Sequence, residues 1–348
     1  MNEIAIYGAG SFGKIFYELI DEKIDFFIDD YSLENLIFGI PIKNIEVVPK
    51  NTTIYISVLQ NSFIIEQKLI EKGFNHVINF SSSVKKIPNI LKRLAKNNYL
   101  WLVDDNYKMY NKEELSKVKK LLSDEKSKII LEQMTKLRET LDIKYYIEPS
   151  DKEYFPKDIP IFENIAEMNF IDCGAYVGDT VKDLMSYCSK VNYCISFEPD
   201  TKNLKHLSAQ LAILNQNYPN TNFFIYPAGV YSSNKILSFS NQGINSSASF
   251  IDNSDIKIPV VALDEIVLNS NPNYIKMDIE GSEKEAILGA QKTIKKYKPN
   301  LAICLYHKPE DLWELPLLIN KIEPNYKMYL RVHEDLCLST VLYCIYKK

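Results

Sequence analysis

The sequence predicts an α/β protein with two domains, each built on a mainly parallel sheet. Short apolar, β-rich runs alternate with helical patterns in both halves of the chain, and a glycine-rich turn follows the first run of each half. A length of 348 residues, of which 46% are apolar and 25% charged, is enough for two domains with sizeable cores.

The first domain is expected at residues 1–95. The segments between its strand-like runs, such as "NSFIIEQKLIEKGF", have the apolar spacing of helices. The predicted strands are residues 3–8, 25–30, 53–58 and 76–80.

A helical connector is expected at residues 96–167. Asn111 and Glu114 form a predicted capping pair, and apolar residues then recur at three- or four-residue steps, or twice that. These helices would either cover a sheet or act as a lid over a bound ligand. In the polar stretch that ends the connector, Tyr154 and Phe155 would be placed to stack on the ring of a substrate.

The second domain is expected at residues 168–348. Two strand-like runs near its end, "YKMYLRVHE" and "STVLYCIYKK", predict an antiparallel pair that closes the edge of the sheet. Arg331 and His333 on the first run would either reach a substrate or form a solvated end. The other predicted strands are residues 168–173, 192–197, 222–227, 273–279 and 300–306.

The first glycine-rich turn, "YGAGSFG", has the pattern of a nucleotide-binding turn. It links a strand to a helix whose first amides can bind an anion, and two aspartates follow about 20 residues later, where a ribose-binding carboxylate is expected. The motif favours nucleotide binding but identifies no residue for hydride transfer. The predicted nucleotide-binding residues are Gly8, Gly10, Ser11, Gly13, Asp29 and Asp30.

A second turn, "DCGAYVGDT", predicts another nucleotide-like pocket. Asp172 ends a strand, Gly174 and Gly178 form the turn, and Asp179 and Thr180 begin a helix. The next strand ends in "FEPD", which places a carboxylate 20 residues after the second glycine of the turn, where it can accept both hydroxyls of a ribose.

Polar residues also follow the third and fourth strands of this domain. "YPAGVYSS" ends the third strand, and its Gly229 permits close backbone approach. "YIKMDIEGSE" ends the fourth and delivers Lys276, Asp278 and Glu280 to the same edge. Ligands of open α/β sheets gather at this edge.

These residues resemble the FkbM family of S-adenosylmethionine-dependent methyltransferases. The motifs "FIDCGAYVGDT", "FEPD", "LDE", "IKMDIEGSE" and "LAICLYHKPEDLWELP" match in order and spacing over roughly residues 145–348. The resemblance implies a class I methyltransferase domain with a Rossmann-like, seven-stranded sheet. It also implies transfer of a methyl group from S-adenosylmethionine to a hydroxyl of a sugar or another small metabolite.

The resemblance further implies the residues of the donor pocket. Asp172, Gly174 and Gly178 would frame the methionine part of the donor, Glu198 would hold its ribose, and Asp278 would close the pocket. The expected donor-binding residues are Asp172, Gly174, Tyr176, Gly178, Asp179, Thr180, Glu198, Pro199, Gly229 and Asp278.

Three residues are candidates for the base that removes the proton of the acceptor hydroxyl. His307 suits this role at neutral pH, with Asp278 and Glu280 as the alternatives, although a structural histidine is nearly as consistent with the sequence. The two carboxylates are also of the kind that binds Mg²⁺, but two are too few to predict a metal site.

The first domain resembles the nucleotide-sugar-binding domain of bacterial sugar acetyltransferases. "IAIYGAGSFGKIFYELI", "FFIDD" and the later "GIPI" carry this resemblance over about 80 residues. It implies a small Rossmann-like domain that either presents a nucleotide-linked sugar or has only a structural or oligomerising role.

Composition narrows the partners and the location. A formal net charge of −4, with no basic block, argues against a nucleic-acid partner. No apolar run reaches the ~18 residues of a membrane span, and the six cysteines show no C-x-x-C pair, so a reducing cytoplasm fits best. The sequence leaves the oligomeric state open, with a homodimer as one option.

We therefore expect an O-methyltransferase acting on a sugar, nucleotide sugar or glycan precursor, with a place in bacterial surface polysaccharide synthesis. Two alternatives stay open from the sequence. One is an NAD(P)-dependent oxidoreductase of nucleotide sugars built on the first glycine turn, and the other is a non-catalytic protein that binds a nucleotide sugar.

Overall fold

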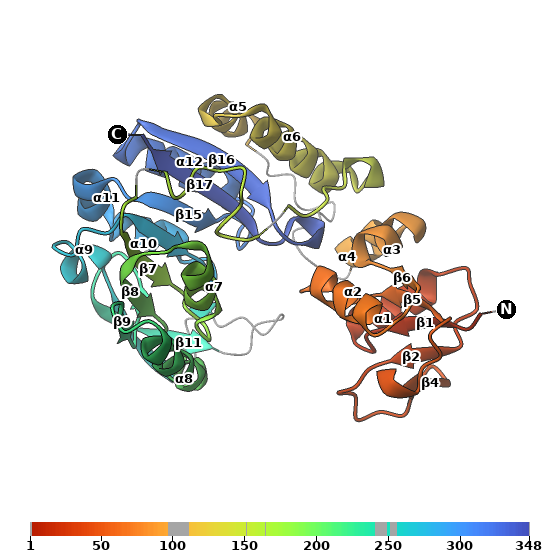
Figure 1. Cartoon of the computed structure of the whole chain (residues 1–348). Coiled ribbons are helices and arrows are strands. Elements are labelled where there is room, and N and C mark those ends of the chain that lie inside the picture. The colour runs from red at the N-terminus through yellow and green to blue at the C-terminus, as the bar shows by residue number, and fades with distance from the viewer. Residues whose placement is uncertain are drawn as a thin grey trace. The chain divides into compact units, whose positions relative to one another are not determined.

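The chain divides into two compact units, each made of several stretches of sequence (Figure 1). Unit 1 comprises Met1–Met109, Glu132–Pro149 and Val332–Leu338, and unit 2 comprises Tyr110–Leu131, Ser150–Arg331 and Ser339–Lys348. The predicted connector is thus divided between the units. The computed structural model describes residues 2–96, 111–150, 152–163, 165–240, 249–250 and 256–347, so residues 97–110 of the connector lie outside the described part.

Unit 1 contains a six-stranded sheet in the order β3-β4-β2-β1-β5-β6. Its pairs are parallel except for β3 with β4, a hairpin that the sequence did not predict. The strands are β1 (Ile4–Tyr7), β2 (Phe26–Ile28), β3 (Leu36–Ile37), β4 (Ile40–Lys43), β5 (Thr53–Ile56) and β6 (His76–Ile78). The helices are α1 (Ser11–Leu19), α2 (Ser62–Glu71), α3 (Phe80–Lys86) and α4 (Ile90–Lys96).

Unit 2 contains a seven-stranded sheet in the order β16-β17-β15-β14-β7-β8-β9. The described pairs from β15 to β9 are parallel, and β17 runs antiparallel to β15. The strands are β7 (Met168–Cys173), β8 (Val191–Phe197), β9 (Asn222–Tyr226), β14 (Tyr274–Met277), β15 (Asn300–Cys304), β16 (Tyr326–Val332) and β17 (Thr340–Tyr346). This sheet confirms the predicted Rossmann-like α/β class.

Helices connect most of these strands and pack beside the sheet (Figure 1). The central strands β7, β14 and β15 are almost wholly buried, which is typical of parallel strands covered on both faces. The helices of unit 2 are α7 (Asp179–Tyr187), α8 (Thr201–Asn217), α9 (Leu263–Ile266), α10 (Glu283–Leu288), α11 (Gln291–Tyr297) and α12 (Asp311–Ile322).

A second, smaller sheet lies in unit 2 between β9 and β14 in the sequence. Its order is β10-β13-β11-β12, and the sequence did not predict it. The strands are β10 (Gly229–Val230), β11 (Lys235–Ser240), β12 (Ser249–Phe250) and β13 (Ile256–Val261).

The helices α5 (Lys112–Leu121) and α6 (Glu125–Thr140) follow residues 97–110, and the turn between them lies against β16. Ser123 N donates to Met328 O at 2.8 Å, and Leu330 N donates to Ser127 Oγ at 2.8 Å. Since β16 is an edge strand, this turn covers backbone groups that would otherwise be unpaired. The placement favours the covering role of these helices over a lid.

Arg331 is a buried ion-pair centre, and both sequence interpretations of it are wrong. Its side chain is 1% exposed, because Nε donates to Asp158 at 2.9 Å and Nη2 donates to Asp124 at 2.7 Å. Nη1 donates to Ser127 Oγ at 3.0 Å and to the Leu330 carbonyl at 2.8 Å. Arg331 therefore ties the α5–α6 turn to β16 and reaches neither solvent nor a substrate.

The loop between β16 and β17 belongs to unit 1. It carries the buried Asp335, whose carboxylate accepts hydrogen bonds from Ser62 Oγ at 2.7 Å, from Tyr146 OH at 2.6 Å and from Ser81 Oγ. Residues close to the C-terminus thus complete the core of the N-terminal unit.

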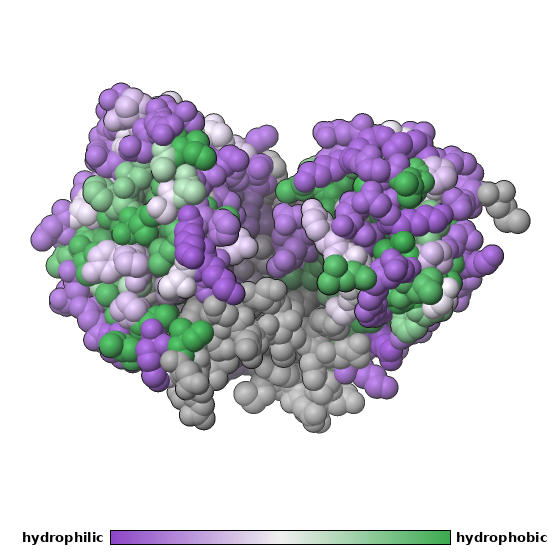
Figure 2. All heavy atoms as spheres, turned by 90° about the horizontal axis from the view of Figure 1, so that it is seen from below, coloured by the Kyte–Doolittle hydropathy of each residue, from purple (hydrophilic) through white to green (hydrophobic). Residues whose placement is uncertain are grey.

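The face seen in Figure 2 is mostly hydrophilic, with small groups of hydrophobic residues on both units. Scattered groups of this kind are normal for a protein surface. None of the helices in the described ranges has the length and apolar character needed to cross a membrane.

Candidate active site

The glycine turn after β7 is the centre of the candidate site. Gly174 adopts φ +84°, and a Cβ atom there would lie 1.8 Å from the carbonyl oxygen of Asp278. Gly178 adopts φ +86° just before α7, and a Cβ there would lie 3.0 Å from Leu207. Both positions need glycine because the left-handed backbone strains other residues, and Gly174 also lets the ends of β7 and β14 meet.

Glu198, at the end of β8, is held against this turn. Its carboxylate accepts from Tyr176 N at 2.9 Å, from Asp200 N at 2.8 Å and from Asn203 Nδ2 at 3.3 Å. Burial raises its pKa, although these hydrogen bonds oppose the shift. The side chain of Tyr176 is 57% exposed at the same turn. The carboxylate and the turn therefore form one connected structure, and the ribose-binding role expected of Glu198 stays a prediction.

Asp172 forms a buried ion pair with Lys276 of β14. Lys276 Nζ lies 3.1 Å from Asp172 Oδ1 and donates to the Gly174 carbonyl at 2.6 Å. Burial raises the pKa of Asp172 to about 6 against the opposing effect of Lys276, and the neighbouring carboxylates raise the pKa of Lys276 despite its burial. Asp172 thus acts on the turn through Lys276, a residue the sequence placed at this edge without a role.

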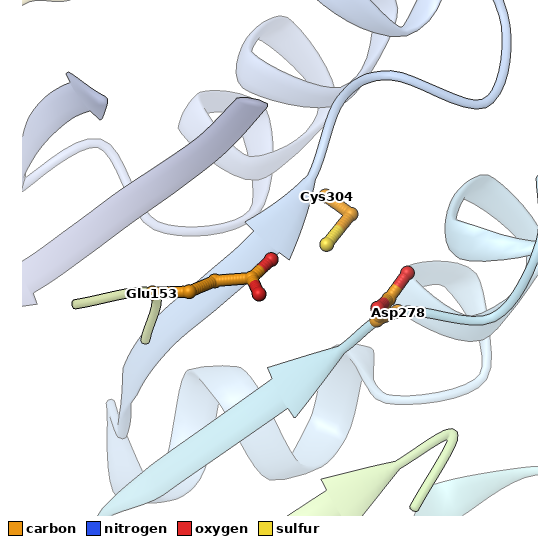
Figure 3. Close-up of side chains that lie close together, drawn as sticks. All are labelled: Glu153, Asp278 and Cys304. Atoms are coloured by element: carbon orange, nitrogen blue, oxygen red, sulfur yellow. The ribbon is translucent and has the colours of Figure 1, made fainter. Parts of the chain in front are cut away.

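Asp278 follows β14, and its carboxylate accepts hydrogen bonds from two tyrosine hydroxyls. Tyr154 OH donates to Oδ2 at 2.8 Å and Tyr306 OH donates to Oδ1 at 3.0 Å. Burial raises the pKa of Asp278, but the lowering effect of Lys276, His307 and these hydroxyls is larger, so the net shift of the pKa is downward. Glu153 and Cys304 also point toward Asp278 (Figure 3), with one oxygen or sulfur atom of each residue within 4.8 Å of the others.

The predicted stacking of Phe155 on a substrate is wrong. Phe155 is 2% exposed and packs against the rings of Phe162, Tyr187 and Tyr274. Tyr154 is 7% exposed, and its hydroxyl also contacts Cys304 Sγ at 3.7 Å. The aromatic pair is part of the core beneath the site.

His307 lies among three carboxylates. Its Nε2 is 3.3 Å from Asp278 Oδ1 and 3.5 Å from Glu280 Oε2, and its Nδ1 is 2.9 Å from Glu283 Oε1. Burial lowers its pKa, but the carboxylates outweigh burial and raise it to about 10. The imidazole is therefore protonated at neutral pH in this arrangement and has no free lone pair to accept a proton.

A strained loop aims these carboxylates. Glu280 and Gly281 adopt φ +56° and φ +88°, and Glu283 Oε1 accepts from Ile279 N at 2.8 Å as α10 begins. Glu283 and Tyr306 were not among the predicted site residues. Their signals were present, since Glu283 ends the motif "DIEGSE" and Tyr306 begins "YHK".

The remaining predicted donor-binding residues differ in exposure and in their position in the fold. Asp179 is exposed and Thr180 buried in the first turn of α7, and Pro199 is half-buried beside Glu198. Gly229 lies in β10 of the small sheet, paired with Val260.

The glycine turn of unit 1 is a separate candidate site. Gly8 adopts φ +101°, and a Cβ on Gly13 would lie 2.0 Å from the Gly8 carbonyl oxygen, whereas a Cβ on Gly10 would meet nothing within 4 Å. Gly10 precedes Ser11, the first residue of α1, and caps that helix without a side-chain hydrogen bond. The turn itself is close-packed, and the start of the helix is open.

Asp29 of unit 1 holds the backbone of that turn, whereas Asp30 holds the backbone at Ile45. Asp29 accepts from Ala9 N at 3.0 Å and from the amides of Tyr31 and Ser32 at 2.9 and 3.0 Å. Asp30 accepts from Ile45 N at 2.9 Å. Both carboxylates therefore have structural partners, and the binding role predicted for them stays a prediction.

The sheet order and the glycine turn of unit 2, with its carboxylate at the next strand end, define a Rossmann-like methyltransferase domain. Residues 172–328 match the model of the methyltransferase FkbM domain. No curated protein matches the chain.

One of three similar solved structures shares the fold of the chain. The FkbM methyltransferase from Methylobacillus flagellatus KT is 22% identical, with a TM-score of 0.59 over 99% of this chain and 90% of its own. An rRNA methylase from Streptococcus thermophilus is 14% identical, with a TM-score of 0.33 over 52% of this chain and 88% of its own. Aeropyrum pernix fibrillarin, which has S-adenosyl-L-methionine natively bound, is 6% identical, with a TM-score of 0.31 over 51% and 66%. Only the first shows a shared fold.

Proposed function

We propose that the protein transfers a methyl group from S-adenosylmethionine to a hydroxyl of a sugar or glycan precursor. The observation that carries this proposal is the connected turn of unit 2, in which Gly174, Tyr176 and Glu198 lie at the carboxyl ends of β7 and β8. A nucleoside bound there would place its ribose hydroxyls on Glu198.

The residues of this chain fit such a donor. Gly174 and Gly178 let the turn pass close to Asp278 and Leu207, and Glu198 is held against this turn by two backbone amides and Asn203. When bound, S-adenosylmethionine supplies an electrophilic methyl group on a sulfonium cation. Asp278 and Glu280 offer negative charge at the adjoining strand end, which favours a cationic donor.

The acceptor hydroxyl would bind beside the same carboxylates. A hydroxyl is a poor nucleophile, so the site must position it in line with the methyl group and remove its proton during attack. Because His307 is protonated, we assign the proton acceptor to an ionised carboxylate, Asp278 or Glu280. The His307 imidazolium then orients that carboxylate and compensates its charge.

For unit 1 we propose the binding of a nucleotide sugar at the start of α1. The open helix start beyond Gly10 supports an anion such as a pyrophosphate, and the packed Gly8–Gly13 turn keeps that start rigid. We further propose a cytoplasmic role in polysaccharide synthesis, on the basis of the two resemblances in the sequence.

Calorimetry on the full chain tests the donor. We expect binding of S-adenosylmethionine, at least tenfold weaker in Glu198→Ala and unchanged in the surface variant Glu314→Gln. Binding of NAD alone, with no effect of Glu198→Ala, would reject the proposal in favour of an oxidoreductase.

Product analysis tests the reaction. The protein is incubated with labelled donor and a panel of nucleotide sugars and glycolipid precursors, and we expect S-adenosylhomocysteine together with one methylated product. Donor binding without any S-adenosylhomocysteine across the panel would identify a non-catalytic binding protein instead.

A further inference from the structure

Beyond the donor turn, the three carboxylates of Asp172, Asp278 and Glu283 lie around two cationic side chains, Lys276 and His307. Asp278, Glu280 and Glu283 all face one imidazole, that of His307, at 3.3, 3.5 and 2.9 Å. Lys276, the nearest buried ammonium, is shared with Asp172. The group therefore has an excess of carboxylates in a largely buried place, which is costly unless a further cation binds.

Two members of this group have buried polar atoms without hydrogen bonds. Glu283 is 0% exposed, and its Oε2 has no hydrogen-bond partner among the described residues. Neither ring nitrogen of His307 forms a hydrogen bond of acceptable geometry with the described residues, although carboxylate oxygens lie close to both. A buried carboxylate oxygen without a hydrogen bond, such as Oε2 of Glu283, is available to bind a cation.

Asp278, Glu283 and His307 each place one ligand atom within 4.8 Å of the other two. Metal–ligand bonds of 2.0 to 2.2 Å give ligand separations of about 3 to 4.4 Å. Asp278 now lies beside Nε2 of His307 and Glu283 beside Nδ1, so closing the group around one ion requires a rotation of the imidazole or of the Glu283 side chain. The Asp278 side chain is 23% exposed, which leaves access for the ion and its water. The neighbouring group of Glu153, Asp278 and Cys304 (Figure 3) is less suitable, because the Cys304 thiol is fully buried and already contacts Tyr154.

We propose that Asp278, Glu283 and His307 bind one divalent first-row transition-metal ion, such as Mn²⁺ or Zn²⁺. The imidazole nitrogen favours such ions over Mg²⁺, which prefers oxygen ligands. With three protein ligands the ion keeps an open position, and its role there, which rests on the proposed function, is to bind the acceptor hydroxyl and lower its pKa. On binding the ion, His307 would lose its proton, and the ion would supply the positive charge that the carboxylates now receive from the imidazolium.

The test is Mn²⁺ binding by the full, chelator-treated chain, followed by the electron paramagnetic resonance of free Mn²⁺. We expect one bound ion per chain, displaced by Zn²⁺, and affinity at least tenfold lower in Glu283→Gln and in His307→Gln. Glu285→Gln is the matched control, because Glu285 lies on the same helix but bonds Ser232; its affinity should equal that of the wild type. Circular dichroism shows whether each variant is folded. If Glu283→Gln does not fold, the Mn²⁺ affinity of His307→Gln decides the test.

Absence of Mn²⁺ and Zn²⁺ binding by the wild type, or equal affinity in a folded ligand variant, would overturn the proposal. Calorimetry with S-adenosylmethionine on the same metal-free samples separates the two hypotheses. Donor binding and methyl transfer without any bound metal would reject the ion and leave the proposed function standing. Metal binding without donor binding would do the reverse.

Discussion

Lys276 connects the buried charge of the site with its backbone. Its ammonium lies between the Asp172 carboxylate and the Gly174 carbonyl, and its side chain is 3% exposed. Removing one partner of such a pair leaves an uncompensated charge in the core, which costs more than the pair itself contributes.

We therefore predict that Lys276→Met lowers the free energy of unfolding by about 3 to 5 kcal/mol. Urea denaturation of the full chain measures the change. The double variant Asp172→Leu/Lys276→Met removes both charges and should recover most of the loss. Equal stability of Lys276→Met and the wild type would show that Asp172 is compensated in another way.

The limits of sequence reasoning are clearest at single residues. Glu198 and Asp278 could be placed at the right sheet edge, because strand ends are visible in the sequence and parallel strands end together. The partner of Asp172 could not, since no periodicity shows that Lys276 of β14 faces it. The protonated state of His307 was equally hidden, because it depends on three carboxylates that the fold gathers around one ring.

At the scale of elements, the contact between the ends of β7 and β14 depends on Gly174. We predict that Gly174→Ala abolishes donor binding in calorimetry and lowers the melting temperature, because the new Cβ would meet the Asp278 carbonyl oxygen. Gly73→Ala is the control: Gly73 adopts φ +88° but a Cβ there meets nothing within 4 Å, so only the backbone strain of about 1 to 2 kcal/mol is expected. Equal effects of both variants would mean that the close approach is unimportant.

The turn between α5 and α6 should make unit 2 sensitive to acid. Burial raises the pKa values of Asp124 and Asp158, but hydrogen bonds and positive charge, mainly from Arg331, Ser127 and Lys126, have the larger effect. The pKa values of both carboxyls are therefore lowered. A lowered folded-state pKa contributes stability above the ordinary aspartate pKa of about 4, and this stability is lost as the pH falls through the folded-state value.

We predict that Arg331→Met is less stable than the wild type at pH 7 and that its stability falls less steeply below pH 4. Denaturation at a series of pH values measures both effects. The control Lys117→Met breaks only exposed ion pairs, with Glu113 and Glu114, and should leave the pH profile unchanged. An unaltered acid slope in Arg331→Met would contradict the role given to Arg331.

Element prediction succeeded where the pattern is local. The runs at residues 168–173 and 300–306 correspond to β7 (Met168–Cys173) and β15 (Asn300–Cys304), because buried parallel strands are continuous apolar runs. The small sheet was missed: β11 and β13 have six residues each, but β10 and β12 have only two. β10 and β12 are strands only because they pair with β13 and β11, and such pairing cannot be predicted from the local sequence.

At the scale of the molecule, each unit needs sequence from several parts of the chain. Asp335 joins the loop after β16 to Ser62, Ser81 and Tyr146 of the same unit. We predict that Asp335→Ala speeds hydrogen exchange in α3 and around Tyr146, because buried hydroxyls lose their acceptor at a cost of about 1 to 3 kcal/mol each. Strands β7 and β14 are the internal control and should keep their exchange rates; a uniform increase along the chain would contradict a local role.

The shared loop also has a consequence for synthesis of the chain. Domains generally fold in the order in which they leave the ribosome. Here Met1–Met109 of unit 1 are made before residues 110–331, and Val332–Leu338 of the same unit are made after them. At 5 to 20 residues per second, translation of the intervening segment from residue 110 to residue 331 takes about 10 to 45 s. During that interval the nascent unit 1 lacks its Asp335 carboxylate, and the hydroxyls of Ser62 and Ser81 must bind water until residue 335 has been made.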